Sequence, residues 1–490
     1  MKTSGILLLL LTFCQPIVAA EKTIDLGGRR ELFVDEYLID SRKGLELRLQ
    51  APVPHDVVMV QDQLWEGTGG SFPTIFRDGD LIRMYYIGGD LTNADATKFM
   101  SHPWYACYAE SKDGIHWTRP DLGLFEFNGS KKNNIILIAG GLDNFTPFKD
   151  TRPDCPADQR YKAVSQGPGG LLAYQSADGI HWSRLGDKPI ITKGAFDSQN
   201  LAFWDATRQQ YWCYLRDFHA GIRDIRWSTS PDFKTWTTPE LLKFPDAPDE
   251  QLYTNQVQPY HRAPHVFIGF PTRYIERSGA ASLQALPAPE HRAKRSKISP
   301  RFGTAITDCL FMTSRDGQTF HRWDEPFLKP GIERKHNWIY GDAYSNLGLL
   351  ETPAEDPDAP AELSIYFIED NWHRPTRLRR YTLRQDGFVA LHARRAQGEL
   401  ITKPFTFRGK QLELNFATSA AGQLRVELQD ETGRPLPGYT FADCDELFGD
   451  TLQRQVTWKG KSDVTPLAGK PIRMRVVMTD ADLYSFRFGE

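Results

Sequence analysis

Acidic residues recur just ahead of five apolar, strand-like stretches of the sequence. Two carboxyl groups that converge on one sugar can cleave a glycosidic bond, because one protonates the leaving oxygen and the other activates water or attacks the anomeric carbon. A third carboxyl group can tune the pKa of the acid through like-charge repulsion. The residues that fit this pattern best are Glu66, Asp197 and Glu250, with Glu250 as the acid and Asp197 or Glu66 as the base or nucleophile.

Polar and aromatic residues in and near the same five segments have side chains suited to sugars. Aromatic rings stack on sugar faces, whereas amides, carboxylates and guanidinium groups bind hydroxyls or an acidic substituent. Each of these residues also has an ordinary structural explanation as a turn cap or a core residue. The expected substrate-binding set is Trp65, Asp143, Asn200, Arg216, Tyr253, Asn255, Arg273, Trp338 and Asp342.

A repeated motif indicates how these segments are positioned. Residues 111–117 are Ser-Lys-Asp-Gly-Ile-His-Trp, and residues 176–182 are Ser-Ala-Asp-Gly-Ile-His-Trp. Residues 230–236 and 314–320 keep the same skeleton, and residues 384–388 form a weaker fifth copy. An aromatic or apolar strand precedes each copy. Asp-Gly between apolar runs is a strong hairpin signal, because that turn needs φ > 0 at both central residues.

Five hairpin-based units of this size predict an all-β fold, a five-bladed β-propeller with one unit per blade. We expect the propeller at residues 61–390, after an N-terminal segment at 21–60. From 391 to 490 the motif disappears and short period-two strands alternate with turns, which indicates a C-terminal β-sandwich. The first strand of each blade would line the central axis, so the acidic segments ahead of those strands would meet at one mouth of the channel.

The N-terminus has the pattern of a signal peptide over residues 1–20. Lys2 is followed by an apolar run at 6–13 and by the small residues Ala19 and Ala20. We therefore expect a secreted or periplasmic protein without membrane attachment after cleavage. The net charge of −3 lacks the basic excess of a nucleic-acid-binding protein. The scattered cysteines predict neither a disulfide framework nor a metal site.

Two charged segments interrupt the predicted strands. Residues 276–302 break the fourth unit with a run rich in Arg and Lys, which is usually a solvated loop. The alternative is a rim loop that meets an anionic sugar. In the C-terminal domain Asp443, Asp445 and Glu446 form an acidic loop, for which a structural calcium ion is the alternative to a plain acidic turn. We expect no other cofactor.

In these features the chain resembles the five-bladed glycoside hydrolase superfamily of invertases, levanases and arabinanases, and within it the invertase-like secreted proteins of planctomycetes. The matching phrases are Trp65-Glu66, residues 108–117, residues 197–200 and residues 314–317. The resemblance implies a site in which an Asp on the first blade is nucleophile or base, a second Asp supports it, and a Glu is the acid. This chain departs from that pattern, because its first-blade candidate is Glu66 and it lacks the invertase Trp-Met-Asn-Asp-Pro signature.

These observations predict a secreted glycoside hydrolase that cleaves a poly- or oligosaccharide, either neutral or anionic. The first alternative is a carbohydrate-binding propeller without catalysis, in which the acids pair with arginines as a structural network. The second is a polysaccharide lyase, for which Tyr253, His219 or His336 could be the base. A glycoside phosphorylase on the same scaffold would instead need a basic phosphate pocket beside one acid.

Overall fold

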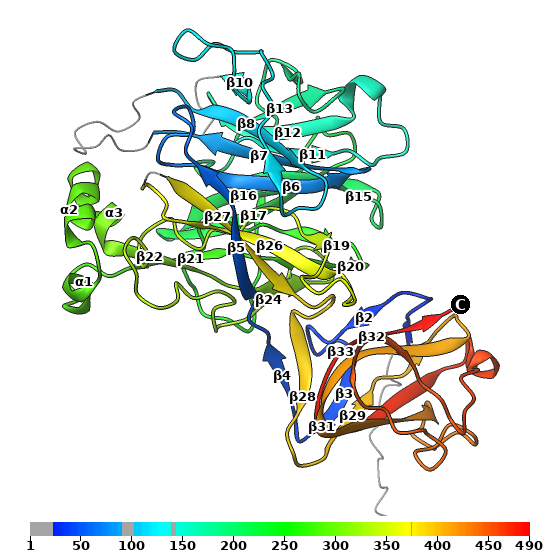
Figure 1. Cartoon of the computed structure of the whole chain (residues 1–490). Coiled ribbons are helices and arrows are strands. Elements are labelled where there is room, and N and C mark those ends of the chain that lie inside the picture. The colour runs from blue at the N-terminus through cyan, green and yellow to red at the C-terminus, as the bar shows by residue number, and fades with distance from the viewer. Residues whose placement is uncertain (1–22, 91–101, 139–143, 374) are drawn as a thin grey trace, which may run out of the picture.

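Five antiparallel sheets form a ring of blades in the computed structural model, which describes residues 23–90, 102–138, 144–373 and 375–490 (Figure 1). Strands that follow one another in the sequence pair within each blade, as a hairpin repeat dictates. The predicted all-β fold with a five-bladed propeller is therefore confirmed. The first two blades contain β6 (Ser71–Asp78), β7 (Leu81–Gly88), β8 (Tyr105–Ser111), β9 (Trp117–Thr118) and β10 (Ile135–Ile138), then β11 (Thr146–Lys149), β12 (Tyr161–Gly167), β13 (Gly170–Ser176) and β14 (Ser183–Arg184).

The remaining blades follow the same plan, and the last one includes a strand from the N-terminal segment. β5 (Val53–Gln61) pairs antiparallel with β27 at the outer edge of blade five, so both ends of the propeller sequence close the ring. Blades three to five contain β15 (Leu201–Asp205), β16 (Gln210–His219), β17 (Ile222–Ser230) and β18 (Glu240–Leu241); β19 (Gln258–Tyr260), β20 (Ala263–Gly269), β23 (Met312–Ser314) and β24 (His321–Arg322); and β25 (Leu350–Thr352), β26 (Glu362–Glu369), β27 (Thr376–Leu383) and β5.

The repeated Asp-Gly motif forms a turn between the third and fourth strands of a blade. Asp113 Oδ1 accepts hydrogen bonds from the N–H groups of Ile115 and His116, both at 2.8 Å, and Ser111 Oγ accepts one from Gly114. Of the Asp-Gly pair only the glycine has a positive φ, +79°. The expected turn with φ > 0 at both residues is therefore wrong, because the aspartate side chain caps the backbone and fixes a different turn.

The same turns fasten blades to their neighbours at the end of the propeller opposite the acidic segments. The Tyr85 hydroxyl in β7 donates to the carbonyl oxygen of Gly179 at 3.0 Å, and the Tyr214 hydroxyl in β16 donates to that of Gly317 at 2.8 Å. A Cβ atom on Gly179 would lie 2.6 Å from the Tyr85 hydroxyl oxygen, so this close approach requires glycine. The motif that identifies the blades is thus a structural element.

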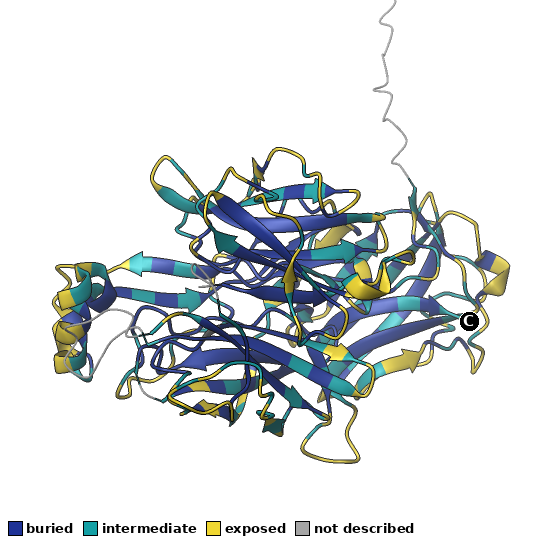
Figure 2. Ribbon diagram, turned by 90° about the horizontal axis from the view of Figure 1, so that it is seen from above, coloured by how far each residue is buried: buried dark blue, intermediate teal, exposed yellow. Residues whose placement is uncertain are grey.

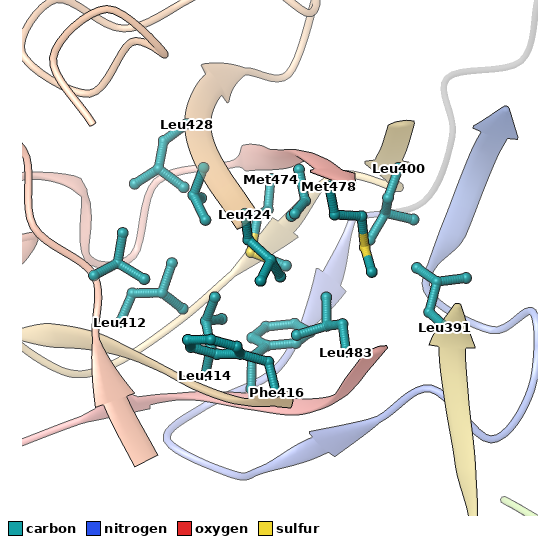
Figure 3. Packing of buried hydrophobic residues seen from close by; sticks show 14 of the residues in the cluster. Leu391, Leu400, Leu412, Leu414, Phe416, Leu424, Leu428, Met474, Met478 and Leu483 are labelled. Carbon is teal, nitrogen blue, oxygen red and sulfur yellow. The ribbon is translucent and has the colours of Figure 1, made fainter. Parts of the chain in front are cut away.

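The C-terminal β-sandwich contains ten strands, four of which come from the N-terminal segment at 21–60. Its longest strands, β31 and β33, pair along most of their length with a register shift between Thr418 and Gln423. Leu412, Phe416 and Met474 belong to its buried core, shown in Figure 3. The strands are β1 (Ile24–Asp25), β2 (Glu31–Leu32), β3 (Ile39–Lys43), β4 (Leu45–Leu49), β28 (Val389–Ala393), β29 (Gly398–Thr402), β30 (Phe405–Thr406), β31 (Gln411–Asp430), β32 (Asp450–Gln455) and β33 (Ile472–Gly489).

Buried Asp386 joins the two domains. Its carboxylate accepts hydrogen bonds from the Tyr260 hydroxyl and Arg262 Nε of blade four, both at 2.8 Å. From the sandwich side, the Ser485 hydroxyl in β33 donates at 2.7 Å and Arg30 forms an ion pair at 3.3 Å. The weak fifth copy of the motif therefore has a role at the domain junction, and so does the fourth copy, in which Arg315 pairs with Glu31 at 2.9 Å and with Asp35 at 2.7 Å.

A helical insertion extends from blade four (Figure 1). The hairpin of β21 (Thr272–Glu276) and β22 (Ala305–Cys309) carries α1 (Ser282–Ala285), α2 (Pro289–Ile298) and α3 (Pro300–Thr304), whose outer surfaces are largely exposed in Figure 2. Buried Arg295 donates to the carbonyl oxygens of Phe302, Asn371 and Tyr340. The expectation of a solvated loop is wrong here, because the segment is helical and its Arg292 and Arg295 are buried with donors on backbone carbonyls, although Lys294 and Lys297 are exposed. Short 3-10 helices lie at Ala157–Gln159 and Thr465–Leu467.

Candidate functional site

The segments that precede the first, inner strand of each blade lie at one end of the propeller. We refer to this end as the mouth. In blade three Leu201 at the start of β15 pairs with Tyr214, so the β16–β17 hairpin reaches the same end. In blade four β21 and β22 extend outward from it, and in blade five the chain at 336–347 approaches it. The mouth is therefore lined by loops rather than by the repeated turns.

Glu66 lies below the mouth surface with no exposed side-chain area. Its carboxylate accepts hydrogen bonds from Tyr86 at 2.6 Å and from the Gln63 N–H at 2.9 Å, and it pairs with Arg119 at 2.8 Å. Burial raises the pKa of Glu66, while the Arg119 guanidinium opposes that shift. This carboxylate has its polar partners inside the protein, as a structural ion pair would.

Asp197 is the most accessible of the three predicted catalytic carboxylates, with a side chain 55% exposed. It forms an ion pair with Arg216, a buried side chain that also lies over the Phe218 and Tyr253 rings. Burial lowers the pKa of Arg216. Asp197 and Phe218, a phenylalanine 39% exposed, line a groove of about 480 Å³ together with the glycines near 167–170. A carboxylate beside an open aromatic ring is a suitable sugar-binding combination.

Glu250 is engaged by two arginines ahead of blade four. Arg273 Nη1 lies 3.0 Å from its carboxylate and Arg322 Nη2 lies 3.2 Å from it. Arg273 also pairs with Asp308 at 2.7 Å, and these partners raise the pKa of Arg273. The structure therefore pairs Glu66, Asp197 and Glu250 each with its own arginine partners, the arrangement expected of a structural network.

Asp342 differs from the other candidates because its carboxyl group is fully buried and is not in a direct ion pair within the described residues. Burial raises its pKa to about 8, although the Asn371 N–H donates to Oδ1 at 3.1 Å. The carboxyl group is therefore largely protonated at neutral pH. The surrounding backbone is unusual, since Trp338, Ala343 and Asp370 all have positive φ, a conformation that concentrates at functional sites.

Asn200 and Asn255, predicted to bind substrate, lie in the interior of the ring. Both are at most 1% exposed. Asn200 Nδ2 donates to two carbonyl oxygens of its own loop, and its Oδ1 accepts the Arg216 N–H at 3.1 Å. Asn255 Oδ1 accepts the Val257 N–H at 3.2 Å. Asn346 repeats the arrangement in blade five, where its Oδ1 accepts the Tyr366 N–H. These amides satisfy the backbone where the inner strands begin.

The predicted aromatic residues have different surroundings. Trp65 packs edge-on against Phe127 and donates to Asn134, as a half-buried core residue does. Trp338 and Arg273 both line a second cavity of about 670 Å³ below the β21–β22 hairpin. Tyr253 is buried, and its ring centroid lies 5.2 Å from the Arg216 guanidinium. Asp143 lies outside the described residues.

The structure places Tyr253 in a cluster of aromatic and basic residues, of which the sequence analysis missed Tyr340 and Tyr344. Tyr340 lies 5.7 Å from Tyr253 and 6.5 Å from Tyr344, measured between ring centroids, and Arg301 of α3 lies 5.3 Å from the Tyr340 ring. Burial raises the pKa values of Tyr253 and Tyr344 well above their usual range, so both hydroxyls are protonated at neutral pH. The spacing of Tyr340 and Tyr344 around Asp342 was the available sequence signal.

Three histidines also approach one another beside this cluster. The ring centroids of His336 and His373 are 3.5 Å apart, and His291 of α2 lies 5.2 Å from His336. Burial lowers the pKa of His291 to about 3 and that of His336 to about 4, so both rings are neutral. In the chain as described, however, no group of three or more His, Cys, Asp or Glu side chains is arranged to hold a metal ion.

The acidic loop of the sandwich has its own internal partners. Asp443 pairs with Lys459 and accepts the Thr440 hydroxyl, Asp445 accepts the Thr457 hydroxyl, and Glu446 lies 3.3 Å from an arginine of β31. Calcium at this loop remains a prediction.

Comparisons with known proteins give remote likenesses. No family model matches the chain. Two curated Mycobacterium tuberculosis proteins, "Uncharacterized protein MT1551" and "Uncharacterized protein Rv1502", are 25% identical over 157 residues, or 30% of this chain and 46% of theirs. The chain thus spans about half the length of the curated relatives it matches. A likeness to planctomycete proteins in particular is not supported.

Solved structures with a similar fold include a "Glycoside hydrolase" at 13% identity and TM-score 0.42, covering 68% of this chain and 92% of that one. A glycoside hydrolase family 43 arabinoxylan arabinofuranohydrolase from Bacillus subtilis has 12% identity and TM-score 0.40, covering 87% and 96%. The catalytic domain of a Coprinopsis cinerea GH62 alpha-L-arabinofuranosidase has 8% identity and TM-score 0.41, covering 68% and 97%. Among the described helices, none has the length and apolar character needed to cross a membrane.

Proposed function

We propose that the protein is a secreted glycoside hydrolase that cleaves a poly- or oligosaccharide at the propeller mouth. The observation that supports this proposal is the contrast between two carboxyl groups in their exposure to solvent and in their partners. Asp197 is exposed and ion-paired, whereas Asp342 is buried with its pKa raised to about 8. Acid and base roles in hydrolases are commonly divided between two carboxyl groups whose environments push their pKa values apart.

In this mechanism Asp197 is the base or nucleophile and Asp342 is the proton donor. The groove beside Asp197 receives the sugar, and the exposed Phe218 ring stacks on it. Asp342 would donate to the glycosidic oxygen only after the loops that bury it move apart, so an opening of the mouth on substrate binding is part of the proposal. The assignment replaces Glu66 and Glu250, because their side chains are 0% and 19% exposed beside their arginines, whereas that of Asp197 is 55% exposed.

The second candidate is carbohydrate binding without cleavage. The arginine partners of Glu66, Asp197 and Glu250 favour it, because a structural ion-pair network was the expectation for that function. A lyase with Tyr253 as its base is less well supported, since burial keeps that hydroxyl protonated. Secretion rests on the signal-peptide pattern of residues 1–20, and mass spectrometry of the mature N-terminus would test it.

The test is hydrolysis of a panel of neutral, sulfated and uronic-acid polysaccharides by the wild type and by Asp197→Asn and Asp342→Asn. Asp187→Asn, which changes an exposed aspartate, is the matched control. We expect the two site variants to lose about 100-fold or more in rate with binding retained, and the control to keep full activity. Binding without turnover in the wild type would favour the second candidate, and full activity in both site variants would refute the carboxylate assignment.

A further inference from the structure

Three guanidinium groups converge on the tyrosines at the mouth. Arg216 of β16 lies 5.2 Å from the Tyr253 ring centroid, and Arg223 of β17 lies 4.5 Å from that of Tyr274. Arg301 of α3 lies 5.3 Å from the Tyr340 ring, which itself contacts both other tyrosines at 5.7 Å. Cations from blade three and from the insertion therefore share one aromatic cluster.

Each of these arginines has a buried donor that lacks a hydrogen-bond partner among the described residues. The atoms are Arg216 Nε, Arg223 Nε and Arg301 Nη1. Buried guanidinium N–H groups are normally satisfied, because removing them from water without a new partner is unfavourable. Three such donors in one cluster indicate that a polar group absent from the protein chain belongs there.

The charge balance indicates the sign of that group. Burial lowers the pKa of Arg216, and repulsion from Arg223 and Arg301 lowers it further, so the three cations act on one another. Asp197 pairs with Arg216, but the partner of Arg223 Nη1 is the neutral amide of Gln251, at 2.9 Å. The exposed Glu276 accepts the Tyr274 hydroxyl at 3.0 Å and the Thr304 hydroxyl at 2.5 Å. In this cluster the three guanidinium groups therefore outnumber the carboxylates of Asp197 and Glu276 that contact it.

We propose that this cluster binds the anionic group of an acidic glycan, through charge-assisted hydrogen bonds from Arg216, Arg223 and Arg301. The ligand chemistry is a carboxylate or a sulfate ester, because guanidinium groups bind planar or tetrahedral oxyanions with paired N–H donors. The proposal rests on the proposed function, since it names the substrate class for the same mouth. It also gives the insertion a role, because α3 supplies one of the three cations.

The experiment is calorimetric binding of three oligosaccharides of equal length: an oligogalacturonate, a sulfated galactan fragment and a neutral galactan fragment. The proteins are the wild type, Arg216→Gln and Arg301→Gln. Arg208→Gln is the matched control, since Arg208 also stacks on an aromatic ring, Phe267 at 4.3 Å, but lies at the opposite end of blade three. Thermal unfolding shows whether each variant is folded. If Arg216→Gln does not fold, binding by Arg301→Gln is the test.

We expect the wild type to bind at least one acidic oligosaccharide about 10-fold or more tightly than the neutral one. Arg216→Gln and Arg301→Gln should each weaken acidic binding by about 10- to 100-fold, and Arg208→Gln should not. A preference for galacturonate identifies the carboxylate as the ligand, and a preference for the sulfated fragment identifies the sulfate ester. Equal binding of all three fragments, or acidic binding unchanged by the variants, would overturn the inference.

Failure of the inference can be separated from failure of the proposed function. Free galacturonate and galactose 6-sulfate are tested as small probes alongside the oligosaccharides. Neutral binding and turnover without an acidic preference would leave the glycoside hydrolase proposal intact and refute the anionic subsite. Binding of the small acids in an Arg216-dependent manner, with no oligosaccharide bound or cleaved, would support the subsite and refute the proposed function. Absence of all binding would refute both.

Discussion

The Tyr366 hydroxyl in β26 donates a hydrogen bond of 2.7 Å to the carbonyl oxygen of Gly114, which lies 252 positions earlier in blade one. The bond joins the last blade to the first through the repeated Asp-Gly turn. Trp117 Nε1 of the same turn donates to that oxygen at 3.1 Å, so the carbonyl group has two partners. Blades one and two, and blades three and four, are joined by tyrosines in the same way.

We expect Tyr366→Phe to lower the free energy of unfolding by about 1 kcal/mol, because one buried hydrogen bond is lost while Trp117 still satisfies the Gly114 oxygen. Urea unfolding followed by tryptophan fluorescence would measure the change. Tyr439→Phe is the control, since its hydroxyl makes an exposed bond of 3.0 Å in the sandwich. An equal loss in both variants would show that the bond between blades five and one adds nothing specific.

We expect Gly179→Ala to destabilise the protein more than Gly186→Ala does. Both glycines have a positive φ, +80° at Gly179 and +85° at Gly186, so both substitutions have the same backbone cost of about 1–2 kcal/mol. Only at position 179 would the new methyl group meet the Tyr85 hydroxyl, at 2.6 Å, whereas nothing lies within 4 Å at position 186. Thermal unfolding of the two variants would measure the difference, and equal losses would contradict the steric argument.

The sequence was sufficient to predict the propeller because its repeat is local. The first four copies are turns capped by their own aspartates, so with the weak fifth copy they identify five blades without knowledge of distant contacts. The partner of β5 was not predictable in the same way, since pairing with β27 depends on ring closure. The four N-terminal strands likewise join the sandwich through long-range pairing that no local pattern records.

The candidate site was only partly predictable for the same reason. The position of Asp197 ahead of an inner strand indicated that it lies at the mouth. The groove that Asp197 lines agrees with that position. The partners that determine its chemistry come from other segments, as Arg119 does for Glu66 and Arg322 for Glu250. Tyr340, another residue of the mouth cluster, contacts Arg301 and Phe302 of the helical insertion. The basic composition of that insertion did not predict its helices.

We expect the stability contribution of Asp342 to depend on pH between about 4 and 8. The unfolded side chain titrates near about 3.9, and burial raises the pKa of Asp342 to about 8 in the folded protein. Below both pKa values the carboxyl group is protonated in the folded and in the unfolded protein, and its contribution to stability is fully present. As the pH rises through this window the unfolded chain loses its proton first, so the free energy of unfolding falls by up to about 1.4 kcal/mol per pH unit.

Asp342→Asn should remove this dependence, because the amide keeps the carbonyl oxygen that accepts the Asn371 N–H but does not titrate. Unfolding midpoints measured from pH 4 to pH 8 should therefore fall less steeply in the variant than in the wild type. Asp158→Asn, at an exposed aspartate, should leave the wild-type slope unchanged. Parallel curves for the wild type and Asp342→Asn would mean that the buried carboxyl group does not hold its proton.

We expect Asp386→Asn to destabilise the domain junction by about 3–5 kcal/mol at pH 7, because it leaves buried Arg30 and half-buried Arg262 without this carboxylate. Although burial raises the pKa of Asp386, the two arginines hold it below its usual value, so the pair is fully formed at neutral pH. Guanidinium chloride unfolding should show a lower midpoint, with the propeller and the sandwich losing structure separately. Asp450→Asn is the control, since its pair with Arg384 is 69% exposed at the aspartate and should contribute about 0–1 kcal/mol. If both variants unfold as the wild type does, the two domains are held together by other contacts, such as the pairs of Arg315 with Glu31 and Asp35, rather than by Asp386.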